Sequence, residues 1–219
     1  MIQDVLMEVF NMRKPLAAIL FFLCLAACAT TAYSAESGAG LILGGSDKSP
    51  VKLEVFSDFE CPACGFFFLN AIPQILENFK DRVCVIYYEF PLPQHPYART
   101  AARYVNAAAR LGDREKLVAI FKTLFTDQDE WAKTGNLDAS ISKALSPEDL
   151  EKVKGIMETE RVDIEQEIDR DIQIGEKRAV YVTPTIIITH GDKEERVSMP
   201  SNIRNIYSLL SGRLNGLLK

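Results

Sequence analysis

The chain has 219 residues, of which 47% are hydrophobic and 25% are charged. This length suits one sizeable core, and the composition is ordinary for a globular protein. The formal net charge is −5 and the sequence contains no basic run. A negatively charged protein repels phosphates, so charge and composition argue against a nucleic-acid partner.

The amino terminus has the pattern of a secretion signal. Arg13 and Lys14 precede an apolar run at residues 16–27, as the charged and apolar regions of a signal peptide do. The run is shorter than the roughly 20 apolar residues of a comfortable membrane-spanning helix, although an uncleaved anchor stays open. We expect residues 1–28 to be a signal peptide, with Met12 as an alternative start because acidic residues precede it.

Two processing routes fit the end of this segment. Residues 25–28 (LAAC) match a bacterial lipoprotein box, in which Cys28 becomes the lipidated first residue. Residues 27–29 (ACA) equally offer the small-x-small pattern of ordinary signal peptidase cleavage. Both routes place the domain in the periplasm or another extracytoplasmic space, where disulfide chemistry is routine. Residues 29–49 then predict a small, polar, Gly-rich tether.

A strand–helix–strand unit follows the tether. Residues 51–56 alternate apolar and charged side chains, which predicts a strand. Residues 61–80 predict a helix with a kink at Pro73, and the apolar residues 82–90 predict a second strand buried on both faces. Two strands joined through a helix should be parallel neighbours.

The middle of the chain predicts a helical block, and the end returns to strands. Capping residues and helical periodicity indicate the block, for example Ser146-Pro147 at the start of its last helix. The expected helices are residues 95–110, 113–125, 136–145 and 147–178, with a break in the last near Gly175 as an alternative. The expected final elements are a hairpin of residues 183–189 and 194–199 and a helix of residues 203–218.

Two cysteines lie where the first predicted strand gives way to a helix. Cys61 lies at the helix N-terminus, where free backbone N–H groups and the helix dipole favour a thiolate. Cys64 follows one turn later, close enough to close a disulfide. Zinc ligation or two inert buried thiols are the alternatives, but structural zinc needs four ligands and usually a second Cys/His pair. The pattern therefore favours a redox centre that needs no metal and no organic cofactor.

This α/β order resembles the thioredoxin fold, in its DsbA-like form with a helical insertion between the second and third core strands. The resemblance covers residues 51–218. It is carried by the matched segments FSDFECPAC at 56–64, His95 with Ala101-Ala102, Phe125, Gln128 and Trp131, and VTPT at 182–185 with Gly191 beyond. We therefore expect residues 50–219 to form one DsbA-like domain, with the insertion at about 95–178.

The resemblance implies roles for individual residues. Cys61 would be the exposed nucleophile and Cys64 the resolving thiol. Thr183 and Pro184 would form a cis-proline loop facing the pair, with the Thr183 backbone binding an extended substrate segment; a trans proline at a strand start is the alternative. Members often carry a buried acid near the end of the first strand, so Glu54 is a candidate proton relay, or else a solvent-facing charge.

The chain also departs from the DsbA pattern. Ala63 stands where DsbA has a histidine between the proline and the second cysteine, so we expect a less oxidising pair than that of DsbA. Asp58 and Glu60 are expected to be solvated. Cys84 is expected to be a buried structural thiol, and His95 to cap the first insertion helix.

The sequence thus predicts an extracytoplasmic thiol–disulfide oxidoreductase that exchanges disulfides with cysteine-containing client proteins, as an oxidase. A redox partner that the sequence does not identify must reset the pair. We expect a monomer that meets the membrane only through its N-terminal signal or lipid anchor. A reductase or isomerase is the alternative within the class. A non-catalytic, surface-anchored binding domain with a static disulfide or metal clip is the alternative from another class.

Overall fold

The computed structural model describes residues 40–200 and 202–219. The expected signal peptide, Cys28 and the first part of the expected tether lie outside the described residues. The last part of residues 29–49 is not a tether, because Leu41–Gly44 form a strand, β1, that pairs with the sheet. This stretch joins the fold because its apolar side chains, such as the buried Leu43, pack into the core.

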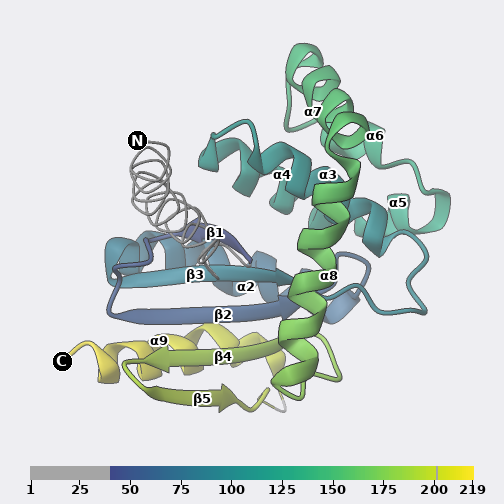
Figure 1. Ribbon diagram of the computed structural model, residues 1–219. Coiled ribbons are helices and arrows are strands. Elements are labelled where there is room, and N and C mark those ends of the chain that lie inside the picture. Colours follow the sequence, from purple (N-terminus) through teal and green to yellow (C-terminus); the bar gives the residue numbers. More distant parts are fainter. Residues whose placement is uncertain (1–39, 201) are drawn as a thin grey trace, which may run out of the picture. The chain divides into compact units, whose positions relative to one another are not determined.

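A five-stranded sheet in the order β1-β3-β2-β4-β5 forms the centre of the domain (Figure 1). Its further strands are β2 (Val51–Ser57), β3 (Val83–Glu89), β4 (Thr185–His190) and β5 (Lys193–Val197). As predicted, β2 and β3 are parallel neighbours, while β4 pairs antiparallel with both β2 and β5. The ends of β2 and β3 therefore reach the same edge of the sheet.

The helices follow the predicted order, but their number and several of their bounds differ from the prediction. They are α2 (Pro62–Phe79), α3 (Ala98–Ala109), α4 (Arg114–Thr126), α5 (Gln128–Thr134), α6 (Leu137–Ile141), α7 (Pro147–Thr159), α8 (Arg161–Lys177) and α9 (Ile206–Leu217), with short 3-10 turns η1 (Lys80–Arg82) and η2 (Ile203–Asn205). Helix α5 was not expected. Helix α3 begins three residues later than expected, after Pro96. The break expected near Gly175 lies instead at Glu160, between α7 and α8.

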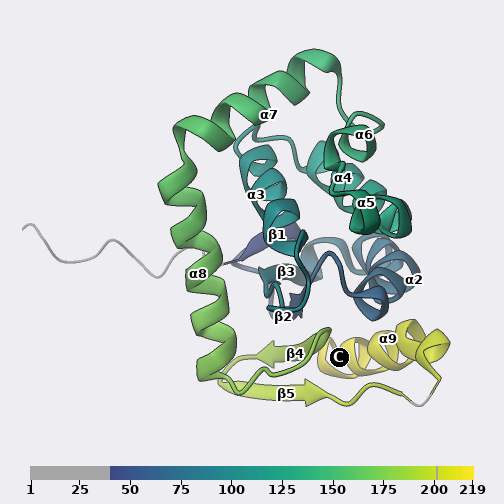
Figure 2. The same cartoon turned by 90° about the vertical axis from the view of Figure 1, so that its right-hand side faces the viewer.

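Helices cover both faces of the sheet (Figure 2), and the two faces bury different side chains. Alternate residues of β2 and β3, such as Leu53 and Val85, face α2, α9 and the helical block in the larger core. Phe56 and Tyr88 face the other way, into a smaller core that the C-terminal half of α8 covers. In β2 and β3 the odd-numbered residues therefore face the larger core, and the even-numbered residues face the smaller one.

Within residues 40–200 and 202–219, no helix combines the length and hydrophobicity needed to cross a membrane.

Gly175 is the one position on α8 where the fold requires a missing side chain. A Cβ atom placed there would lie 2.6 Å from the Phe90 ring. The smaller core therefore cannot accept a side chain at this position unless Phe90 or the helix moves. Gly155 in α7 offers a matched contrast, because a Cβ there meets nothing within 4 Å.

We therefore expect Gly175→Ala and Gly155→Ala to change stability with opposite signs. Overpacking should lower the free energy of unfolding of Gly175→Ala by about 1–2 kcal/mol. Better helix propensity should raise that of Gly155→Ala by about 0.5–1 kcal/mol. Urea unfolding followed by circular dichroism measures both. Two changes of the same sign would contradict the packing described for α8.

Candidate active site

The two cysteines lie at the edge of the sheet where β2 ends. Cys61 is the N-cap residue of α2, and the N–H groups of Cys64 and Gly65 donate to its carbonyl at 3.0 and 3.1 Å. Pro62 occupies the first turn, where a missing N–H costs nothing. Cys61 is 8% exposed and Cys64 is fully buried, and both are free thiols. The predicted pair is therefore brought together at a helix N-terminus.

The surroundings separate the proton affinities of the two thiols. A hydrogen bond from the Cys64 thiol lowers the pKa of Cys61 to about 5. The backbone N–H groups of Cys64 and Ala63 lower it further, while burial opposes the shift. Burial holds the pKa of Cys64 well above its usual range, and the nearby Cys61 raises it further. Cys61 is thus suited to be a thiolate nucleophile and leaving group, while Cys64 stays protonated.

The loop before β4 faces the pair, as expected. The Thr183–Pro184 peptide bond is cis, and the Cys61 Sγ donates to the Thr183 carbonyl at 3.4 Å. Residues separated by more than a hundred positions in the chain therefore meet at one sulfur. The Thr183 hydroxyl is buried without a hydrogen-bond partner in the described part of the chain.

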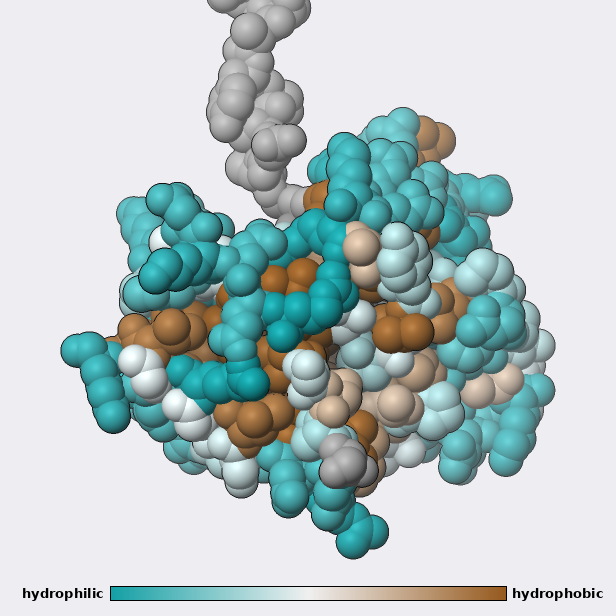
Figure 3. All heavy atoms as spheres, turned by 90° about the horizontal axis from the view of Figure 1, so that it is seen from below, coloured by the Kyte–Doolittle hydropathy of each residue, from teal (hydrophilic) through white to brown (hydrophobic). Residues whose placement is uncertain are grey.

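Hydrophobic side chains reach the surface next to this loop. Tyr181 is 78% exposed and Val182 is 66% exposed, and on the cysteine side Pro62 and Ala63 are also exposed. Seen from below, the domain shows hydrophobic residues gathered among hydrophilic ones (Figure 3). An apolar rim beside a reactive thiol is a surface on which extended polypeptide can be held.

Glu54 does not lie with the cysteines. It accepts hydrogen bonds from Arg178 at 2.7 Å, Thr189 at 2.6 Å and Tyr88 at 3.2 Å, on the sheet face that α8 covers. Burial alone would raise the pKa of Glu54, but the bonds from Arg178 and Thr189 hold it below its usual value. Glu54 is therefore neither beside the pair, as a relay would be, nor solvent-facing: it is buried, and the partly buried Arg178 that follows α8 neutralises it.

Asp58 and Glu60 are not the solvated acids that were expected. Asp58 is buried and accepts from the Leu92 N–H, the His95 Nδ1 and the Glu60 N–H, each at 2.7 Å. Glu60 accepts from the Tyr97 N–H at 2.8 Å. The turn before Cys61 needs these acceptors, because its carboxylates hold the Pro-rich loop that leads into α3. His95 consequently binds Asp58, and Tyr97 is the N-cap of α3.

Gln128 belongs to the matched pattern, but the sequence alone predicts no role for it. Its Nε2 donates to the Phe59 carbonyl at 2.6 Å and to the Cys61 carbonyl at 3.0 Å. A single amide from α5 thus fixes the backbone on which the nucleophile sits. The unexpected helix α5 explains the omission, since without it no element carries Gln128 to the site.

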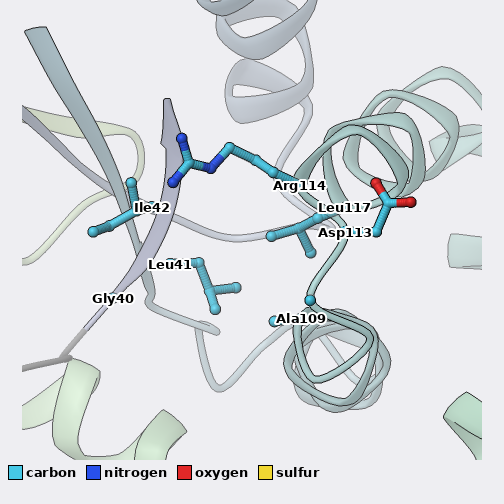
Figure 4. A pocket seen from close by; sticks show the side chains of 8 residues that line it. Gly40, Leu41, Ile42, Ala109, Asp113, Arg114 and Leu117 are labelled. Atoms are coloured by element: carbon cyan, nitrogen blue, oxygen red, sulfur yellow. The ribbon is translucent and has the colours of Figure 1, made fainter. Parts of the chain in front are cut away.

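Two cavities open elsewhere on the domain. One of about 220 Å³ lies between β1 and the ends of α3 and α4, with Leu41, Ile42 and Arg114 among its lining residues (Figure 4). Another of about 440 Å³ lies beside the Pro-rich loop, with Leu92 and His95 in its wall. Neither is lined by Cys61 or Cys64. In the part of the chain that the structure describes, no three His, Cys, Asp or Glu side chains are grouped as metal ligands.

Comparison with known proteins agrees with this geometry. A family model described as Thioredoxin matches residues 37–205. The probable disulfide bond formation protein D of Bacillus cereus is 23% identical over 161 residues, which cover 72% of this chain and 71% of that protein. Disulfide bond formation protein D of Bacillus subtilis is 23% identical over 150 residues, or 66% of this chain and 65% of that one.

Solved structures with the same fold include oxidised BdbD from Bacillus subtilis, with a TM-score of 0.63 at 21% identity over 82% of this chain and 93% of that chain. DsbA2 from Pseudomonas aeruginosa has a TM-score of 0.60 at 22% identity, covering 84% of this chain and 100% of that chain. The expected α/β fold and the expected family are confirmed. The chain belongs to the thioredoxin family, and its fold is that of solved DsbA-family proteins.

Proposed function

We propose that this protein oxidises cysteine pairs of client proteins outside the cytoplasm, through disulfide exchange at Cys61 and Cys64. The observation that carries the proposal is the opposite perturbation of two neighbouring thiols, one with a pKa of about 5 and one held protonated by burial. A non-catalytic disulfide, a metal site or a pair of inert thiols would not require the two pKa values to be shifted in opposite directions. Relatives named for disulfide bond formation support the same direction.

The reaction would proceed in two exchanges. A client thiolate attacks the Cys61 sulfur of the oxidised pair, the bond to Cys64 breaks, and Cys64 takes the electron pair and a proton. A second client thiolate then attacks the client sulfur of the mixed disulfide, and Cys61 leaves as a thiolate. The client gains a disulfide, and the protein is left with two reduced cysteines. A redox partner must remove those two electrons before the next turn.

The loop of Thr183 and Pro184 is the proposed client-binding element. The Thr183 carbonyl lies against the Cys61 sulfur, so an extended client segment pairing with this backbone would present its cysteine to the nucleophile. The exposed Tyr181 and Val182 add apolar contact without a deep pocket. Such a site would recognise unfolded chain with little sequence preference.

An oxidase role fits the site better than a reductase or isomerase role. A disulfide is a strong oxidant when its reduced form is stabilised, and a thiolate that accepts hydrogen bonds from Cys64 and backbone N–H groups is such a form. Ala63 supplies no charge, so the pair should be less oxidising than that of DsbA.

We also propose that residues 1–28 direct export, with Cys28 as the lipidation site of the lipoprotein alternative. The intact mass of the exported protein decides between a lipidated Cys28 and ordinary cleavage. If residues 1–28 remain attached after export, both processing routes are wrong.

The ionisation of Cys61 should be visible directly. In the reduced protein, the rate of alkylation of Cys61 should rise with pH around a midpoint of about 5. Cys64→Ala removes the hydrogen bond that lowers this pKa most, so the midpoint should move up toward the usual cysteine range of about 8.5. A midpoint near 8 in the unaltered protein would contradict the proposed nucleophile.

Trapping should then separate an enzyme from a static clip. Cys64→Ser keeps the Cys61 thiolate but cannot resolve a mixed disulfide, so it should accumulate a covalent adduct with a disulfide-bearing peptide. The unaltered protein should release that peptide, and Cys61→Ser should form no adduct. Mass spectrometry without reductant measures all three. Failure of Cys64→Ser to form any adduct would leave the binding-domain alternative standing.

A further inference from the structure

The loop between α8 and β4 is anchored at both ends and exposed in the middle. Tyr181 and Val182 form the exposed middle. The carbonyl of Thr183, the next residue, lies 3.4 Å from the Cys61 Sγ. At the β4 end, Thr185 pairs with β2, and its hydroxyl donates to the Val182 carbonyl at 2.7 Å. The position of the Thr183 carbonyl therefore depends also on what holds the other end of the loop, where α8 stops.

A residue with left-handed backbone conformation closes the end of α8. The N–H groups of Ala179 and Val180 donate to the carbonyls of Glu176 and Gly175 at 3.0 and 2.9 Å, and Val180 is buried in the smaller core. Ala179 has a φ of 54°, in the left-handed region where helices usually end on glycine. An alanine is strained in this conformation, so the turn persists only where other contacts determine it.

Arg178, the residue before this turn, supplies such contacts. Its Nη1 donates to the Glu54 Oε1 at 2.7 Å, and its Nη2 donates to the Glu54 Oε2 at 3.2 Å. The same Nη2 donates to Glu194 of β5 at 3.0 Å, and the guanidinium carbon lies 5.5 Å from the centre of the Phe56 ring. The Arg178 carbonyl accepts a hydrogen bond from Arg196 of β5. The side chain and the backbone of one residue thus bind the end of α8 to β2 and β5.

Glu54 joins these contacts to the rest of the sheet. Its carboxylate also accepts from the Thr189 hydroxyl of β4 at 2.6 Å and from the Tyr88 hydroxyl of β3 at 3.2 Å. Each carboxylate oxygen therefore has two donors, and the side chain is 8% exposed. A buried ion pair often adds little net stability, because removing both charges from water is costly. A bidentate pair with both oxygens occupied does, however, define one geometry.

We propose that Glu54 and Arg178 are positioning residues for the client-binding loop, which fix the end of α8 and so hold the Thr183 backbone beside Cys61. The two side chains bind neither cysteine, so they act on the binding of extended polypeptide and not on the chemistry of the sulfur. Clients that pair with the loop should depend on this ion pair, whereas a small dithiol that reaches Cys61 directly should not. The inference rests on the proposed function, in which the loop of Thr183 and Pro184 binds clients.

Replacing both partners at once separates positioning from folding. Arg178→Met alone leaves the buried Glu54 charge unpaired, which destabilises the fold whatever the loop does. Glu54→Gln combined with Arg178→Met leaves no buried charge. The amide can still bond to the Thr189 and Tyr88 hydroxyls, and the methionine side chain can still cover the Phe56 ring. Urea unfolding followed by circular dichroism checks that this double variant folds.

The double variant should distinguish a polypeptide from a small thiol. We expect its oxidised form to react about tenfold more slowly with a reduced, unfolded peptide that contains two cysteines, since small displacements of binding groups have effects of this size. Its rate constant with dithiothreitol should stay within about twofold of that of the unaltered protein, because this reagent needs no backbone pairing. Rapid quenching with an alkylating reagent and mass spectrometry gives both rate constants. Hydrogen exchange should become faster in residues 179–183 and stay the same in residues 61–67.

An ion pair between α3 and α8 provides the matched control. Arg110 donates to the two Glu167 oxygens at 3.1 and 3.0 Å, and its side chain is 20% exposed, against 18% for Arg178. Its other hydrogen bonds go to Asn106 and Glu160, outside the loop. Arg110→Met combined with Glu167→Gln should therefore leave the ratio of the peptide and dithiothreitol rate constants unchanged.

Arg178→Lys tests the same point if the double variant does not fold. It keeps the charge beside Glu54, but one nitrogen cannot reproduce the fork that binds both Glu54 oxygens and Glu194, so the ratio should fall here too. A ratio within about twofold of that of the unaltered protein in the variant that folds would overturn the inference. An equal fall in the Arg110 control would overturn it as well. Absence of exchange with either reductant in the unaltered protein would instead overturn the proposed function.

Discussion

The contact on which the site depends is the one that the Cys61 sulfur makes with two distant parts of the chain. The Cys64 thiol and N–H groups of α2 stabilise the thiolate from one side, and the Thr183 carbonyl meets the thiol from the other. The helix start requires β2 to end at Ser57, and the loop requires β4 to begin at Thr185 beside β2. The sheet thus positions the Cys61 sulfur between the N-terminus of α2 and the loop of Thr183 and Pro184.

The two faces of the sheet keep two sets of carboxyl groups apart. On the face that α8 covers, Glu54 is an ordinary buried anion, because Arg178 neutralises it. On the face of the cysteines, Asp58 accepts three hydrogen bonds, while burial raises the pKa of Glu89 well above its usual range and no described cation lowers it. A single parallel register therefore places a structural ion pair on one side of the sheet and a buried acid without such a partner among the described residues on the other.

Much of this arrangement could be predicted because it is local. The strand, the cysteine pair at a helix start and the parallel second strand follow from residues close in sequence, whereas the proline loop was expected only from the family resemblance. What could not be predicted depends on distant partners. The burial of Asp58 requires N–H groups more than thirty residues away, and the state of Glu54 requires Arg178, 124 residues away. Strand β1 is only four residues long, too short for a periodic signal, and the break at Glu160 has no proline or glycine to mark it.

The reduction potential of the Cys61–Cys64 pair tests the central claim most directly. Because the fold stabilises the reduced pair through the Cys61 thiolate, the disulfide should be an oxidant. Equilibration with glutathione, followed by alkylation and mass measurement, should give a value between about −120 mV, as for DsbA, and about −180 mV. A value of about −200 mV or below, near those of glutaredoxins and thioredoxin, would mean that the site keeps its disulfide and would contradict the account.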